Sequence, residues 1–185
     1  MALLKPGRKI AACVFLAAVV AVSARADDLA LEYRVKAAFV FNFARFVTWP
    51  ADRFAGPDAP LDLCVLGRDP FGRHLADVVR DKRVAGRMIS LHYAQAPDRL
   101  PACEILFIGE SESDRLHELL AGVTTEPVLT VSELPEFAFR GGMIRLLVEN
   151  GKVRFEINPA AARAAGLDIS SRLLSVARLT PARGY

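Results

Sequence analysis

Cysteine and histidine are scarce in this chain, which has only three of each among 185 residues. His74, His92 and His117 have no H-x-x-x-H spacing, and Cys64 and Cys103 stand 39 residues apart, so no zinc-ligand pattern is present. The sequence also lacks a G-x-S-x-G nucleophile elbow and a phosphate-binding P-loop. These absences predict a protein that has no catalytic residues, no cofactor and no metal site.

Acidic residues are absent from the first 26 positions, where 19 residues are apolar and four are basic. Three basic residues among positions 5–9 precede an unbroken apolar run of 13 residues, 10–22. This run is shorter than the roughly 20 residues of a membrane span, and an A-x-A sequence ending at Ala26 follows it. The pattern predicts a secretory signal peptide, residues 1–26, cleaved after Ala26. An uncleaved N-terminal anchor is the alternative.

Positive and negative charges are nearly balanced in residues 27–185, which follow the predicted leader. Of the 24 lysines and arginines, four lie in the leader, so 20 remain against 21 acidic residues, and residues 27–185 carry a formal net charge of −1. No basic field remains to bind nucleic acid or an anionic membrane. Export to an oxidising compartment makes Cys64 and Cys103 a candidate disulfide pair. Two buried thiols that never meet are the alternative.

Residues 27–185 have the length of one domain. Apolar periodicity predicts helices at about 28–47, 70–80, 111–120 and 159–179, the last interrupted at Gly166, and strands at 61–66, 88–93, 105–108, 128–131, 143–149 and 152–157. Asn150-Gly151 is a strong hairpin signal, and Asn158-Pro159 offers a helix cap followed by a first-turn proline. The order indicates an α/β fold, a single compact domain with an about six-stranded, mostly parallel sheet, helices on both faces and a C-terminal β-hairpin.

Two groups of polar and aromatic residues are candidates for binding a protein partner. On the first predicted helix, Arg34 and Arg45 lie opposite the apolar arc and Phe41 lies at its border. On the last predicted helix, Arg172 lies opposite the apolar face. Arginine and aromatic side chains are common anchors of protein interfaces. The alternative is that these arginines are solvated or ion-paired, with Glu156 as the partner of Arg172.

A series of short motifs runs through almost all of residues 27–185. They are Tyr33-x-Val35-Lys36-Ala37-Ala38-Phe39, Asn42-Phe43, Phe46, Trp49-Pro50, Cys64-Val65-Leu66-Gly67, Gly86-Arg87, Cys103-x-Ile105-Leu106-Phe107-Ile108, Leu129-Thr130-Val131-Ser132, Gly141-Gly142-Met143-Ile144, Val153-Arg154-Phe155-Glu156-Ile157-Asn158 and Gly166-Leu167-x-Ile169-Ser170-Ser171-Arg172-Leu173-Leu174. In order and spacing they resemble the YfiR/HmsC-like family of exported bacterial proteins.

The resemblance implies a periplasmic regulator that binds the sensory domain of an inner-membrane diguanylate cyclase and holds the cyclase inactive. An outer-membrane lipoprotein that removes the repressor, and a homodimer, are further implied partners. Cys64 and Cys103 match a disulfide pair of the family, whereas a second pair that some members carry is missing here. Two other hypotheses are a small-molecule sensor that serves another membrane protein, such as a histidine kinase, with its crevice at the carboxyl ends of the strands, and an enzyme of unknown type.

Overall fold

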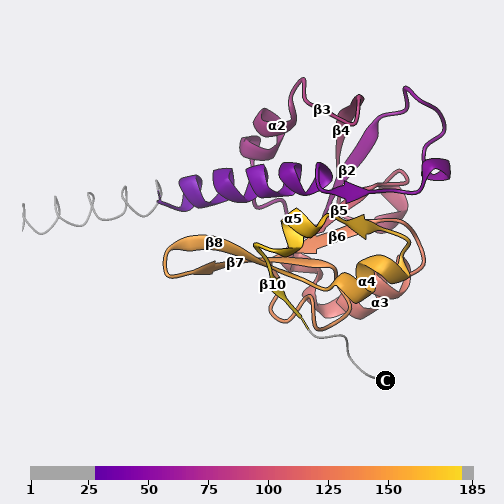
Figure 1. The fold of residues 1–185 in the computed structure, drawn as a ribbon. Helices are drawn as coiled ribbons and strands as arrows, with labels where there is room; N and C mark the ends of the chain where they lie inside the picture. Colours follow the sequence, from indigo (N-terminus) through magenta and orange to yellow (C-terminus); the bar gives the residue numbers. More distant parts are fainter. Residues whose placement is uncertain (1–27, 181–185) are drawn as a thin grey trace, which may run out of the picture.

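Residues 28–44 form a long helix that lies along the sheet (Figure 1). The structure is a computed structural model that describes residues 28–180; the predicted signal peptide, its cleavage site and the last five residues lie outside that range. Ala37, Val40 and Phe43 are completely buried at helical spacing, as an amphipathic helix requires. Within the described part of the chain, no helix is both long enough and apolar enough to cross a membrane.

The main sheet has eight strands in the order β10-β8-β7-β6-β5-β2-β4-β3. These are β2 (Leu61–Leu66), β3 (Arg83–Val84), β4 (Arg87–Ala94), β5 (Ile105–Ile108), β6 (Leu129–Ser132), β7 (Ile144–Glu149), β8 (Lys152–Ile157) and β10 (Arg178–Leu179). Strands β4, β2, β5, β6 and β7 are parallel, whereas β3 and β8 run antiparallel to their neighbours β4 and β7. All six predicted strands are present. The predicted number is corrected to eight, because two-residue strands such as β3 and β10 have no periodicity to recognise.

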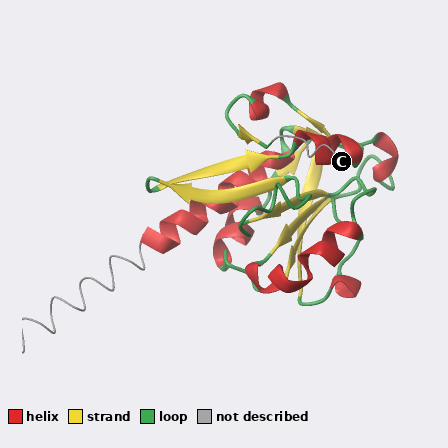
Figure 2. Cartoon of the chain, turned by 90° about the horizontal axis from the view of Figure 1, so that it is seen from below, coloured by secondary structure: helices red, strands yellow, loops and turns green. Residues whose placement is uncertain are grey.

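The two faces of the sheet carry separate hydrophobic cores because side chains alternate along each strand. In β2, Leu63 and Val65 belong to the larger core, and Cys64 and Leu66 belong to the smaller one. The N-terminal helix, α2 (Arg73–Val79), α4 (Pro159–Ala164) and α5 (Ser171–Leu174) contribute to the larger core, and α3 (Leu116–Ala121) covers the smaller one. Helices therefore lie on both faces, as predicted (Figure 2).

The β7–β8 hairpin projects from the body beside the N-terminal helix (Figure 1). Asn150 and Gly151 adopt the left-handed φ angles, 53° and 69°, that a tight two-residue turn requires. At the base of the hairpin, the ring of Phe155 lies 5.4 Å from that of Phe39 and 5.2 Å from that of Phe43. The hairpin prediction is confirmed. The hairpin does not form the edge of the sheet, because β10 pairs with the outer side of β8.

The prediction of a helix running to Leu179 is wrong. Asp168–Ile169 form the strand β9, which pairs with β1 (Val47–Thr48) in a separate two-stranded sheet, and helix is confined to α5. The backbone N–H of Ser170 donates to the carbonyl of Phe46 at 2.8 Å. Farther on, β10 pairs with β8. In a longer helix these backbone groups would hydrogen-bond within the helix, but here they bind distant strands. The first helix also ends earlier than predicted, because Val47 pairs with Ile169 in the two-stranded sheet.

Candidate functional site

The carboxyl ends of β2 and β5 meet where the order of the parallel strands reverses, which is the usual place for a ligand crevice in such folds. Here the chain fills that place itself. A Cβ atom on Gly67, whose φ is +82°, would lie 2.4 Å from side-chain oxygens of Ser111 and Glu112. The Ser111 hydroxyl accepts from the N–H of Arg68 at 2.8 Å. The segment after β5 thus packs closely against the turn after β2 at this point, and the ligand-sized pocket lies elsewhere.

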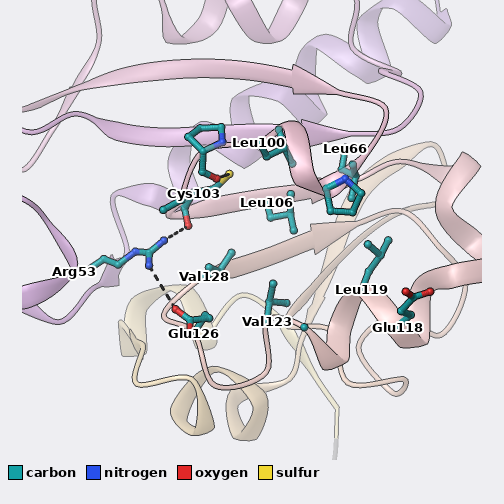
Figure 3. Close-up of a pocket in the computed structure, with 14 residues that line it drawn as sticks. Arg53, Leu66, Leu100, Cys103, Leu106, Glu118, Leu119, Val123, Glu126 and Val128 are labelled. Atoms are coloured by element: carbon teal, nitrogen blue, oxygen red, sulfur yellow. Dashed lines mark hydrogen bonds and ion pairs between the residues drawn. The ribbon is translucent and has the colours of Figure 1, made fainter.

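An open pocket of about 490 Å³ lies on the face of the sheet that carries the smaller core (Figure 3). Its floor consists of Leu66, Leu106 and Val128, which come from β2, β5 and the residue before β6. One wall is the segment 97–103, and the other is α3 with the turn that follows it. Both walls carry aliphatic side chains, namely Leu100, Leu119 and Val123. The arrangement can hold an apolar molecule of small size.

Arg53, in the short 3-10 helix Ala51–Arg53, lies at one end of this pocket and is held by three groups (Figure 3). Its Nη2 donates to the carbonyl oxygen of Cys103 at 2.7 Å, and its Nε donates to Oε1 of Glu104 at 3.0 Å. Its Nη1 lies 3.7 Å from the exposed carboxylate of Glu126. The guanidinium thus interacts with groups of the protein itself, and it links the segment before β5 to the loop after β1.

Glu104 is the least exposed carboxylate of this network, and its pKa is raised. Burial is the larger cause, because it disfavours the charged form; the N–H of Asp62, which donates to Glu104 at 2.7 Å, and the charge of Arg53 oppose it. The backbone oxygen of Glu104 accepts from the indole N–H of Trp49 at 3.2 Å. Glu104 therefore fixes several segments of the chain rather than facing a substrate.

Cys64 and Cys103 form a disulfide, as predicted, with their Cα atoms 6.0 Å apart. Cys64 lies in the middle of β2 and is completely buried, and Cys103 precedes β5 and lines the pocket. The bridge joins the carboxyl end of the segment 97–103, which forms one wall of the pocket, to strand β2 of the sheet. It is therefore a structural part of the pocket.

The residues predicted to bind a partner lie on two elements. Arg34 and Arg45 are exposed on and just after the N-terminal helix, and Arg172 is exposed on α5. Within the described residues none of these three arginines forms an ion pair. Phe41 is half-buried and packs against the larger core. The alternative partner for Arg172 is wrong, because Glu156 lies 3.3 Å from Arg145 and 3.6 Å from Arg178.

Sequence reasoning missed a buried charge on the N-terminal helix. The ammonium group of Lys36, whose side chain is 5% exposed, binds the carboxylates of Glu32 and Glu133 and lies over the ring of Tyr33. Burial, and then the charge of Glu133, raises the pKa of Tyr33. The Glu32–Lys36 spacing of four residues was the one available signal, since Glu133 is remote in sequence. The cluster anchors the helix to the loop after β6.

The histidines do not come together. His92 lies 2.7 Å from one carboxylate, that of Asp62, while His74 and His117 belong to different helices, α2 and α3. Between residues 28 and 180, no group of three or more His, Cys, Asp and Glu side chains is arranged to hold a metal ion.

Strand order and pocket together define a doubly wound α/β domain with an apolar, ligand-sized cavity on one face. A comparison with protein families gives a match to the YfiR/HmsC-like family over residues 33–178, from the N-terminal helix to β10. The chain therefore belongs to the YfiR/HmsC-like family, which the motif series resembles. No curated protein is similar enough to count as a match.

Proposed function

We propose that this protein is a periplasmic regulator that binds the periplasmic sensory domain of an inner-membrane diguanylate cyclase and represses it. The family match over residues 33–178 carries this proposal, because it covers the sheet up to the first residue of β10. Cyclic-di-GMP synthesis, and with it biofilm formation, would then be controlled through a protein contact.

Deleting the gene should raise the cyclic-di-GMP concentration in a host that carries the cognate cyclase, because the repressing contact is lost. The measurement is the nucleotide content of cell extracts. The control is the deletion strain carrying the gene in trans, which should return to the starting level. An unchanged concentration, together with an altered response of a neighbouring histidine kinase, would contradict the proposal and assign the protein to a different membrane sensor.

We propose further that the partner contacts the outer side of the N-terminal helix and α5. Arg34→Glu and Arg172→Glu should each weaken capture of the membrane partner by about 1 to 2 kcal/mol, because an exposed arginine anchor becomes a repelling carboxylate. Capture is measured by pulling down solubilised membranes with the tagged protein at several concentrations. Both side chains are exposed, so the melting temperature should stay within a few degrees of the wild type.

Arg163→Glu is the matched control, since Arg163 is an exposed arginine on α4, away from the projecting end of the N-terminal helix (Figure 1). It should leave capture unchanged. Phe41→Ala is a poorer probe than the arginine changes, because the ring packs against the larger core and its loss also costs stability. Wild-type capture by both folded arginine variants would place the interface elsewhere.

A second candidate function is that of a small-molecule-sensing accessory protein for another membrane sensor, such as a histidine kinase. The observation that favours it is the apolar pocket over the smaller core. Ligand occupancy could bias the affinity for the partner, because any ligand that binds one state better shifts the equilibrium toward it. The response of the kinase in the deletion strain distinguishes this function from the first.

A further inference from the structure

We propose that the pocket between α3 and the segment 97–103 binds a small organic cation with an apolar body, of the alkylammonium type. The inference stands on the pocket alone and does not require either candidate membrane partner. Its volume of about 490 Å³ lies within the roughly 300–1,000 Å³ of small-molecule sites.

The lining supplies the apolar part of the recognition. Leu66, Leu106 and Val128 are buried at the floor, whereas Leu100 and Leu119 are only partly buried and pack against the smaller core. An apolar ligand would remove the exposed parts of these two leucines from water, which is favourable in proportion to the area covered. The disulfide at Cys103 and the Arg53 hydrogen bond to the same residue hold one wall in place, so little ordering is needed on binding.

The charges at the mouth select the sign of the ligand. Glu118 and Glu126 line the pocket with exposed carboxylates, and Glu126 is 57% exposed. Among the lining residues Arg53 is the one cation; its Nε and Nη2 bind Glu104 and the carbonyl of Cys103, and its Nη1 lies 3.7 Å from Glu126. The end of the pocket at Glu118, which forms no ion pair within residues 28–180, is therefore acidic toward an incoming molecule. Glu118 and Glu126 lie at opposite ends of the pocket (Figure 3), so an ammonium group gains from one of them, Glu118, whereas a carboxylate of the same length is repelled there.

Three probes of equal chain length separate these contributions: octyltrimethylammonium, octanol and octanoate. The protein is purified from the periplasmic fraction of an expressing host with labelled Leu and Val methyl groups. Octyltrimethylammonium should shift the methyl signals of Leu106, Leu119 and Val123 in a saturable way. Signals of Leu63 and Val65, which point into the larger core on the opposite face, should not move. Affinity should fall in the order cation, alcohol, carboxylate.

Two sets of variants test the two parts of the recognition. Glu118→Gln should weaken cation binding about two- to fivefold at low salt, as one exposed charge contact implies. Octanol binding should stay unchanged. Glu110→Gln, an exposed carboxylate outside the pocket, is the matched control and should alter nothing. Val123→Phe, or Ala102→Phe if the first variant fails to fold, should weaken all three probes at least tenfold by filling the cavity.

Saturable cation binding that these glutamine and phenylalanine variants weaken supports the proposal. Three results overturn it: no saturable methyl shift with any probe, octanoate as the tightest probe, or cation binding that persists unchanged in a folded phenylalanine variant. The third result would place the cation elsewhere on the surface. None of these results bears on the cyclic-di-GMP concentration of the deletion strain, so failure of this proposal is distinguishable from failure of the proposed regulatory function.

Discussion

Replacing Cys64 by serine should lower the free energy of unfolding by about 2 to 5 kcal/mol. The bridge joins residues 39 positions apart, and in the chain-entropy model a closed loop of that size is worth about 4 kcal/mol. Cys64 is also completely buried in the smaller core, where a serine hydroxyl would lose its hydration. Urea unfolding without reductant measures the change.

Cys103→Ser should have an effect of similar size, and the wild-type protein unfolded in dithiothreitol should resemble both variants. This agreement distinguishes loss of the bridge from damage by serine at one position. Titration of the denatured wild-type protein should detect no free thiol from this pair. Two free thiols without reductant, or unfolding that dithiothreitol does not change, would show that the bridge is not formed.

Arg53→Met should destabilise the protein by about 3 to 5 kcal/mol at pH 8, because it leaves the carboxylate of Glu104 buried without its cation. The side chains of Arg53 and Glu104 are only 12% and 5% exposed. Methionine restores part of the packing but none of the hydrogen bonds to Glu104 and Cys103. Arg73→Met is the matched control; its side chain is 86% exposed, so the change should cost less than about 0.5 kcal/mol.

The destabilisation by Arg53→Met should be smaller at pH 5 than at pH 8. The pKa of Glu104 is already raised above its ordinary value, so the folded state binds this proton more readily than the unfolded state. Stability from this group therefore falls as pH rises through the window above the unfolded pKa of 4.5. Arg53 lowers the pKa of Glu104, so its removal raises that pKa further and widens the pH window. Adding Glu104→Gln should abolish this extra pH dependence; its persistence would assign it to another group.

Several features were predictable from sequence because neighbouring residues create them. The strands Leu61–Leu66 and Ile105–Ile108 coincide with their apolar runs. The Asn150-Gly151 turn is forced by left-handed φ angles that few residues tolerate. Asn158 caps α4 as predicted, its side chain accepting from the N–H of Ala161 at 3.0 Å. In each case the energy depends on residues within one turn or one strand.

The candidate site was predictable only in its disulfide. Arg53 and Glu104 lie 51 positions apart, and each resembles an ordinary surface residue in the sequence. Nothing local indicates that Lys36 meets Glu133, at a separation of 97 positions. The last predicted helix was wrong for the same reason: residues 168–169 and 178–179 pair with strands that enter from elsewhere in the chain.

The sequence by itself determined the alternation of strands and helices, the hairpin turn, the helix cap and the pair of cysteines, because each is encoded by short-range sterics, periodicity or residue chemistry. The tertiary structure alone decided that Gly67 brings Ser111 and Glu112 into the place of a crevice. It also decided that the cavity lies over the smaller core and that Arg53 is used within the protein. Those outcomes depend on which remote backbone and charged groups satisfy one another once water is excluded.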